Sequence, residues 1–136
     1  MYVKKDILFV YKLKIADKIV IYTEEKHLAN LPTETVMLYV KFKKAILELN
    51  SDLTILPHKY YISFKLAKNL IDVELQKHSI KFVINLKSGK LKDAKGIARD
   101  VSNIGHRGNG DYHIQVYDDK EIEYIKTLFK QVLIRN

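Results

Sequence analysis

The residues best suited to chemistry gather in one short stretch, residues 99–113, with the sequence RDVSNIGHRGNGDYH. Three glycines, two histidines, two arginines, two aspartates and two asparagines lie within these fifteen positions, whereas the rest of the chain mostly alternates apolar and charged residues. Such a set could cradle an anion, hold a divalent metal ion, or supply acids and bases for catalysis. It could also be only an elaborate turn.

Glycine and arginine side by side favour anion binding. Gly105, Gly108 and Gly110 would let backbone amides approach an anion, and Arg107 would add positive charge. The P-loop and the dinucleotide fingerprint both lead directly into a helix, whereas this stretch leads into a predicted strand. We therefore exclude a nucleotide loop of either kind. An anion-binding nest and a compact loop with a type I′ turn at residues 109–110 both stay open.

Two histidines and a carboxylate could hold a divalent cation. His106, Asp111 and His113 lie within eight residues, and Asp100 is close in sequence. The spacing matches no established metal motif, and aspartates at such positions commonly hold turns. We therefore expect no metal and no cofactor, and a metal-dependent enzyme is the third of three interpretations.

Enzyme signatures are weak in the rest of the chain. Asp72, Glu74 and Lys77 resemble the carboxylate–lysine pattern of restriction-type nucleases, but Gln76 occupies the position where that pattern needs lysine. No serine lies in a G-x-S-x-G nucleophile elbow, and the chain has no cysteine. We expect no catalytic residue, so the sequence favours a binding domain over an enzyme.

The charge balance indicates the kind of partner. The chain has 24 lysines and arginines against 16 acidic residues, a net charge of +8, which can attract polyanions such as nucleic acid. Only three of these cations are arginines, and the lysines are spread over nearly every segment. A merely solvated lysine surface is the alternative.

The 136 residues suffice for one domain with a sizeable core, and 47% of them are apolar. Charges interrupt the apolar stretches, which stay well short of the roughly 18 residues that a membrane helix needs. The lack of cysteine excludes disulfides and the common zinc modules. We expect a cytoplasmic protein without a membrane partner.

The elements that must position residues 99–113 follow from hydrophobic periodicity. β-Branched and aromatic residues predict an N-terminal hairpin, helical spacing predicts two helices, and period-two alternation predicts four strands. The hairpin is expected over residues 7–22, the helices over 33–49 and 119–133, and the strands over 58–67, 70–76, 78–87 and 112–117.

These elements predict an α+β fold. A three-strand meander plus a fourth strand would form an antiparallel sheet with both helices on one face, preceded by the N-terminal β-hairpin. The apolar hairpin would leave an exposed edge, which makes a homodimer plausible. The second face of the sheet would be polar and open to a partner, and it would carry Tyr61, Ser63, Lys65, Asp72, Glu74, Lys81 and Asn85.

Three motifs carry a resemblance to a known family. They are an aromatic YIxxK strand at residues 61–65, a DVELQ strand at residues 72–76, and the most specific one, RDVSxxGHxGNGDY, at residues 99–112. Over residues 24–136 the chain resembles an uncharacterised C-terminal domain family described as a predicted transport protein (domain of unknown function 5655). Relatives often carry Trp after the Gly-His pair, where this chain has Arg107, so the position is more cationic here. Residues 1–136 would form a single domain, with residues 1–23 outside the resemblance.

The resemblance implies an accessory role. Members of the family also occur fused to proteins that resemble modification-dependent restriction enzymes. This context implies a non-catalytic domain in nucleic-acid metabolism or in defence against foreign DNA, with a nuclease as a partner protein. No membrane segment in the chain supports the description as a transport protein.

We therefore predict a domain that binds nucleic acid through the polar sheet face and the 99–113 stretch. The lysines would meet phosphates, the arginines and histidine would reach out from the loop, and the tyrosine could stack on a base. A protein-interaction or small-anion-binding module without nucleic acid is the second interpretation. The binding residues we expect are Arg99, His106, Arg107, Lys65, Lys81 and Tyr61, and the residues expected to hold the turn are Asp100, Gly105, Gly108, Asn109, Gly110 and Asp111.

Overall fold

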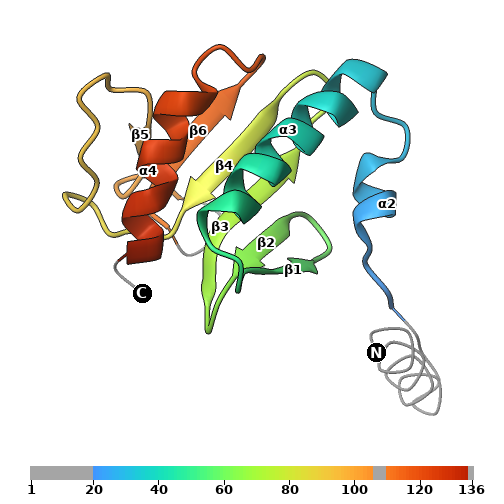
Figure 1. The fold of residues 1–136 in the computed structure, drawn as a ribbon, viewed down its shortest axis with the longest axis horizontal. Coiled ribbons are helices and arrows are strands. Elements are labelled where there is room, and N and C mark those ends of the chain that lie inside the picture. Colours follow the sequence, from blue (N-terminus) through green and yellow to red (C-terminus); the bar gives the residue numbers. More distant parts are fainter. Residues whose placement is uncertain (1–19, 106–109, 135–136) are drawn as a thin grey trace.

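An antiparallel sheet runs through the computed structural model, which describes residues 20–105 and 110–134 (Figure 1). Its strands are β1 (Thr54–Pro57), β2 (Ile62–Lys65), β3 (Asn69–Leu75), β4 (Ile80–Ile84), β5 (Arg99–Asp100) and β6 (Tyr112–Val116), and the helices are α2 (Glu24–Leu28), α3 (Thr33–Leu49) and α4 (Ile122–Ile134). The strand order is β1-β2-β3-β4-β6-β5, and every neighbouring pair is antiparallel. The described chain is therefore α+β, as predicted.

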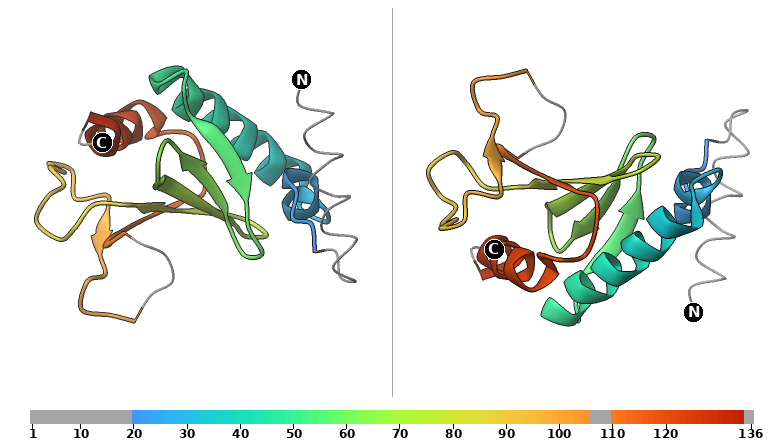
Figure 2. Two further views of the ribbon diagram at one scale, coloured as in Figure 1. Left: turned by 90° about the horizontal axis from the view of Figure 1, so that it is seen from below. Right: turned by 90° about the horizontal axis from the view of Figure 1, so that it is seen from above.

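The two long helices, α3 and α4, lie on the same face of the sheet (Figure 2). The core forms between them and the sheet, where the ring of Phe82 in β4 lies 4.9 Å from that of Phe42 in α3 and 5.2 Å from that of Phe129 in α4. All three side chains are fully buried. Because aromatic side chains bury large apolar areas, this cluster anchors both helices to the centre of the sheet.

A buried hydroxyl ties the start of α3 to the sheet. Pro32 precedes the helix, where its fixed φ and missing N–H are harmless. In the first turn of α3, the buried Thr35 hydroxyl donates to the carbonyl oxygen of Lys77, in the β3–β4 turn, at 2.7 Å. The helix is therefore held to the sheet by a hydrogen bond as well as by apolar packing.

The short helix α2 is fastened to α3 through Glu24. Its N-terminal end is capped by Thr23, whose Oγ1 accepts from the backbone N–H of Lys26 at 3.1 Å. The Glu24 carboxylate accepts from the Tyr39 hydroxyl at 2.6 Å and pairs with the Lys43 ammonium at 2.9 Å. Burial, together with this carboxylate, raises the pKa of Tyr39.

The main elements of the sequence-based prediction are confirmed. The helix expected over residues 33–49 is α3, and the C-terminal helix is α4, which begins at Ile122 rather than near residue 119. The four predicted strands correspond to β2, β3, β4 and β6, which are shorter than the alternating segments that predicted them.

Three described elements lie where hydrophobic periodicity predicts none. β1 has four residues and ends in proline, and β5 has only two residues, so neither is long enough for a clear alternation. α2 has five residues, none of them buried, so it has no apolar stripe. The described sheet therefore has six strands instead of the four expected.

Most of the predicted N-terminal hairpin falls on residues 1–19, which lie outside the described part. Its last residues, Val20, Ile21 and Tyr22, belong to no strand of the sheet. In the ranges 20–105 and 110–134, no helix is long and apolar enough to cross a membrane.

Candidate functional site

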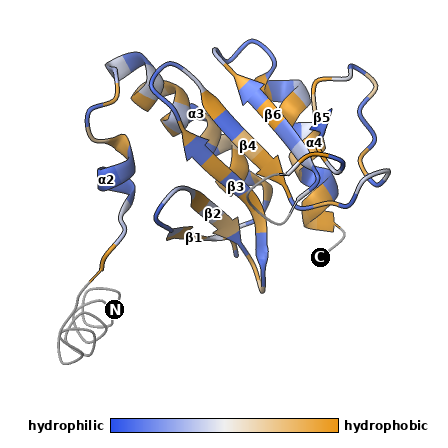
Figure 3. Ribbon diagram, turned by 180° about the vertical axis from the view of Figure 1, so that it is seen from behind, coloured by the Kyte–Doolittle hydropathy of each residue, from blue (hydrophilic) through white to orange (hydrophobic). Residues whose placement is uncertain are grey.

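One row of side chains crosses the sheet on the face opposite the helices. The strand register pairs Ser63 with Asp72, Asp72 with Val83, Val83 with His113, and His113 with Arg99. The adjacent row points into the helical core, so this row faces away from it. Figure 3 views this face, on which polar and apolar positions alternate along β3, β4 and β6. We call it the polar sheet face.

A pocket of about 420 Å³ lies on the polar sheet face, over β4, β6 and β5. Two of the predicted binding residues, Lys81 and Arg99, line it together. Lys81 lies in β4 and Arg99 in β5, and the two meet because β6 pairs with both strands. The other described residues that line it are Gln76, Ile97, His113 and Gln115.

The wall of the pocket formed by β3, β4 and β6 is ordered by hydrogen bonds. The Gln115 amide nitrogen donates to the Gln76 amide oxygen and to the Ser79 hydroxyl oxygen, both at 2.7 Å. The Lys81 ammonium pairs with the Glu74 carboxylate across β3 and β4 at 2.9 Å. These pairings fix the side chains in place but also offset the positive charge of Lys81.

Of the described residues that line the pocket, Arg99 carries the positive charge most available to a ligand. It is exposed, and among the described residues its guanidinium makes no ion pair or hydrogen bond. A guanidinium presents several N–H donors in a plane that matches phosphate or carboxylate oxygens. The pocket can therefore accept an anion, with Arg99 as the main contact.

Asp111 joins β6 to the segment after β4. Its backbone N–H donates to the carbonyl oxygen of Leu86 at 3.0 Å, and its own carbonyl oxygen accepts from the N–H of Val101 at 2.8 Å. Its carboxylate accepts from the backbone N–H of Ser88 at 2.9 Å. Asp111 thus holds three segments together at the base of the 99–113 loop.

Asp100 is engaged on the other side of the same loop. Its carboxylate accepts from the Ser88 hydroxyl and from the backbone N–H of Ser102, the latter at 2.9 Å. These hydrogen bonds, that from the Ser88 hydroxyl foremost, hold the pKa of Asp100 below its usual range. Both aspartates therefore make contacts within the chain rather than pointing into the pocket.

The glycines of the loop differ in their surroundings. A Cβ on Gly110 would lie 1.8 Å from the carbonyl oxygen of Ile84, whereas no atom of the described residues lies within 4 Å of a Cβ on Gly105. Gly110 permits a close approach of two backbone segments that no other residue allows. His106, Arg107, Gly108 and Asn109 lie outside the described residues.

Tyr61 and Lys65 do not join Lys81 and Arg99. Both belong to the β2 end of the sheet, and neither lines the pocket. The ring of Tyr61 packs on that of His58, with centroids 4.6 Å apart, and the side chain is half-buried. The structure therefore brings together two of the four described residues that the sequence predicts to bind.

The polar sheet face is not open over its whole width, and the expectation that Ser63 and Asp72 are exposed on it is wrong. Ser63 is fully buried and Asp72 is 5% exposed. The Ser63 hydroxyl donates to the Asp72 carboxylate at 2.7 Å, which satisfies both groups. Burial raises the pKa of Asp72, although the Ser63 hydrogen bond and the nearby His58 oppose this.

Gln76, Gln115 and the position of His113 on the pocket wall were not predicted from the sequence. The alternation of β6 places His113 and Gln115 on one face, and pairing with β4 would have put them beside Lys81. Within the described ranges, no group of three or more histidine, aspartate or glutamate residues is arranged to hold a metal ion.

Comparison with known proteins places the chain among relatives of unassigned function. Residues 24–131 match the family model described as "Domain of unknown function (DUF5655)". An uncharacterized protein of Haemophilus influenzae is 41% identical over 122 residues, which cover 90% of this chain but 40% of that protein. No solved structure matches. The predicted resemblance to domain of unknown function 5655 is confirmed, and the chain belongs to the DUF5655 family.

Proposed function

We propose that this domain binds nucleic acid through the phosphate backbone, on the polar sheet face. One observation carries the proposal: the strand register brings Arg99 and Lys81 to one pocket with Gln115 and His113. Positively charged and amide side chains are the groups that most often contact phosphate and sugar. The net charge of +8 would add a long-range attraction that is independent of sequence.

Backbone contact is a better match to the pocket than base stacking. Stacking on single-stranded nucleic acid needs exposed aromatic rings along the groove. None of the described residues that line the pocket is aromatic apart from the histidine ring, and Tyr61 already packs against His58. The proposed binding is therefore tolerant of base sequence and sensitive to salt.

The domain would act as an accessory module rather than as the catalytic part of an assembly. The resemblance implies that family members are fused to restriction-enzyme-like proteins, which would fit a setting in nucleic-acid metabolism or defence against foreign DNA, with a nuclease partner. The length of the Haemophilus influenzae relative, of which this chain covers 40%, is compatible with such a second part. The proposed role implies a cytoplasmic location, where the DNA and the nuclease would both be found.

Fluorescence anisotropy tests the proposal. We would titrate the protein into labelled single-stranded and double-stranded DNA and RNA across a salt series, and repeat this with Arg99→Gln/Lys81→Gln. Each lost phosphate contact should flatten the plot of log K against log salt by about 0.9. The double variant should therefore bind more weakly at low salt and show a slope flatter by roughly one to two.

A matched control separates the pocket from the overall charge. Lys44→Gln/Lys130→Gln removes two exposed lysines from α3 and α4, on the other side of the molecule. This control should lose much less affinity than the pocket variant. Equal losses for both variants, or no binding to any nucleic acid at low salt, would rule out the proposal.

A small-anion-binding module is the second candidate, and the size of the pocket favours it. A volume of about 420 Å³ falls within the roughly 300–1,000 Å³ of small-ligand sites. Calorimetric titration with inorganic phosphate distinguishes the two: saturable binding that Arg99→Gln abolishes, without any binding of oligonucleotides, would favour the small-anion module.

A further inference from the structure

A small cleft lies where the short helix α2 meets the turn that joins β1 to β2. Tyr22, Lys26, His27 and Lys59 line it, and we call it the α2 cleft. It lies beside the β1–β2 end of the sheet, whereas the pocket of the polar sheet face lies over β4, β6 and β5 at the other end. The two are therefore separate sites.

Hydrogen bonds hold the walls of the α2 cleft in place. The Nε2 of His27 donates to the carbonyl oxygen of His58 at 2.6 Å, which fastens α2 to the β1–β2 turn. The backbone N–H of His58 donates to the carbonyl oxygen of Tyr61 at 2.7 Å, which closes that turn. Glu24 fastens the other side of α2 to Tyr39 in α3. The cleft is therefore a formed feature of the fold.

The α2 cleft offers two lysine ammonium groups to an anion. The Lys26 ammonium donates to the carbonyl oxygen of Ile21 at 2.8 Å, which positions it and leaves it further N–H donors. Lys59 is exposed, and its Nζ lies 5.2 Å from the centroid of the Tyr60 ring. Among the described residues, no ion pair involves Lys26 or Lys59, and none of those that line the cleft is acidic. A phosphate group would therefore meet positive charge that is not already neutralised.

Exposed aromatic rings stand beside these lysines. Tyr22, on the cleft wall, is 39% exposed, and Tyr60 is 52% exposed. The cleft has a volume of about 80 Å³, far below the roughly 300–1,000 Å³ of sites that enclose a small molecule. It can take a phosphate group but not a whole nucleotide, so a base attached to that phosphate would lie at the mouth of the cleft. Aromatic rings in such a place stack on unpaired bases.

We propose that the α2 cleft binds single-stranded nucleic acid, with a phosphate between Lys26 and Lys59 and a neighbouring base stacked on Tyr22. A single strand is needed because the bases of a duplex are paired and already stacked on one another. The inference goes beyond the backbone binding proposed for the polar sheet face and rests on other residues. Contacts to phosphate alone carry no information about the bases, whereas this cleft would distinguish an unpaired base from none.

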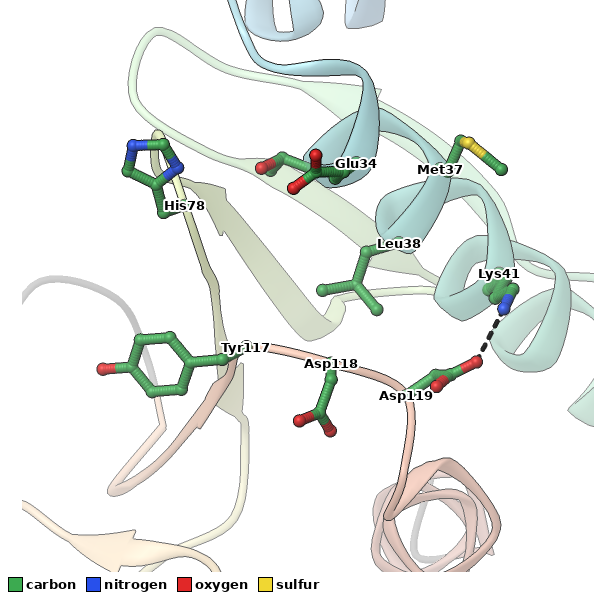
Figure 4. A pocket seen from close by; sticks show the side chains of 9 residues that line it. Glu34, Met37, Leu38, Lys41, His78, Tyr117, Asp118 and Asp119 are labelled. Carbon is green, nitrogen blue, oxygen red and sulfur yellow. Dashed lines mark hydrogen bonds and ion pairs between the residues drawn. The ribbon is translucent and has the colours of Figure 1, made fainter.

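The larger pocket on the helical side of the molecule does not suit the same ligand (Figure 4). It has a volume of about 340 Å³, and Glu34, Asp118 and Asp119 line it against one lysine, Lys41. That lysine already pairs with Asp119 at 2.6 Å. A lining of this charge repels phosphate. Tyr117 in this pocket is 72% exposed, so it provides a matched control: an exposed tyrosine in acidic surroundings.

Fluorescence anisotropy with two labelled strands tests the stacking. One strand is an oligothymidylate of about ten nucleotides, and the other is an abasic strand with the same number of phosphates. The full chain should bind the oligothymidylate about tenfold more tightly than the abasic strand. Tyr22→Leu should remove this preference and leave the affinity for the abasic strand unchanged, whereas Tyr22→Phe and Tyr117→Leu should keep the preference. Equal affinities of the wild type for both strands, or a preference that survives Tyr22→Leu, would overturn the inference.

The lysines are tested by the salt dependence. Lys26→Gln/Lys59→Gln should weaken the binding of both strands alike and flatten the plot of log K against log salt by about 0.7 for each lost contact. An unchanged slope would overturn the inference. Titration with inorganic phosphate identifies a site for free phosphate: saturable binding that this double variant abolishes, in a protein that binds neither strand, would equally overturn it.

The two proposed sites fail in different ways. Arg99→Gln/Lys81→Gln leaves the α2 cleft intact, so it should weaken both strands and keep the roughly tenfold preference between them. Loss of the preference in that variant would overturn the present inference. Wild-type binding of both strands with equal affinity would also overturn it, but would leave the backbone binding of the polar sheet face standing.

A tryptophan reporter gives a readout that does not depend on affinity. The chain has no tryptophan, so Tyr22→Trp would introduce its only one. A base stacked on this ring should quench its fluorescence when the oligothymidylate is saturating, and the abasic strand should not. Tyr117→Trp should respond to neither strand. Equal quenching at both positions, or none at position 22, would contradict stacking in the α2 cleft.

Discussion

Gly110→Ala should be among the most damaging single changes in the chain. The new Cβ would lie 1.8 Å from the carbonyl oxygen of Ile84, also within 3 Å of the Cα of Asn85, and both neighbours are backbone. Ordinary contact begins at 3.4 Å, so the two segments would have to separate by about 1.6 Å. No side-chain rotation can relieve this clash, because neither partner is the end of a flexible side chain.

The separation would break the bonds made by the next residue. The Asp111 N–H donates to Leu86 at 3.0 Å and its carboxylate accepts from the backbone N–H of Ser88 at 2.9 Å, and a shift of this size would carry both beyond hydrogen-bonding distance. Two lost hydrogen bonds at about 1 kcal/mol each, plus about 1–3 kcal/mol for overpacking, give a loss of about 3–5 kcal/mol. That is a large part of the roughly 5–15 kcal/mol by which domains are stable.

Urea unfolding followed by circular dichroism measures the loss, and Gly105→Ala is its matched control. Gly105 belongs to the same loop, has no positive φ, and has no described neighbour within 4 Å of an added Cβ. This control should stay within about 0.5 kcal/mol of the wild type. A loss of less than about 1 kcal/mol for Gly110→Ala, or equal losses at both glycines, would refute the steric reasoning.

Three further predictions concern the interior. Burial raises the pKa of Asp72 in the folded protein above its unfolded value of 3.8. The protonated carboxyl therefore contributes to stability below pH 3.8, and this contribution is lost as the pH rises through the folded-state pKa. Asp72→Asn can still accept a hydrogen bond from Ser63, so it should raise the free energy of unfolding at pH 7. In urea titrations this gain in stability should shrink as the pH approaches 3.8, and a gain that grows toward acid pH would contradict the prediction. Phe82→Ala should cost about 3–5 kcal/mol in the same assay, since it removes the ring between the two helices, and a cost under 2 kcal/mol would show that the core collapses around the gap. Thr35→Val should cost about 1–3 kcal/mol because the Lys77 carbonyl loses its buried donor, and an unchanged midpoint would mean that water replaces it.

The long regular elements could be predicted because each has a repeating apolar pattern. α3 buries Tyr39, Phe42 and Ile46 at helical spacing, and β3 and β4 alternate over several residues. β1 and β5 have too few residues for a period to be visible, and they are strands only because a neighbour supplies the hydrogen bonds. Pairing with a distant segment is a tertiary property that local patterns do not contain.

Only part of the candidate site could be predicted from the sequence in this way. Alternation along single strands put Lys81 on the polar sheet face, and composition singled out Arg99. Their meeting depends on the register of β6 against both β4 and β5, which a connection of 27 residues between β4 and β6 does not determine. The burial of Ser63 and Asp72 could not be predicted from the sequence either. A serine and an aspartate on adjacent strands can hydrogen-bond to each other, so neither needs water as a partner.

In the described part of the chain, both edges of the sheet offer little backbone for strand addition, which limits how a partner can bind. β5 offers two residues at one edge, and β1 offers four at the other, the last of which, Pro57, has no N–H to donate. A partner chain that tried to extend the sheet would find too few backbone donors and acceptors in register. Recognition by this domain must therefore use side chains on its surfaces, so single side-chain substitutions should be able to abolish it.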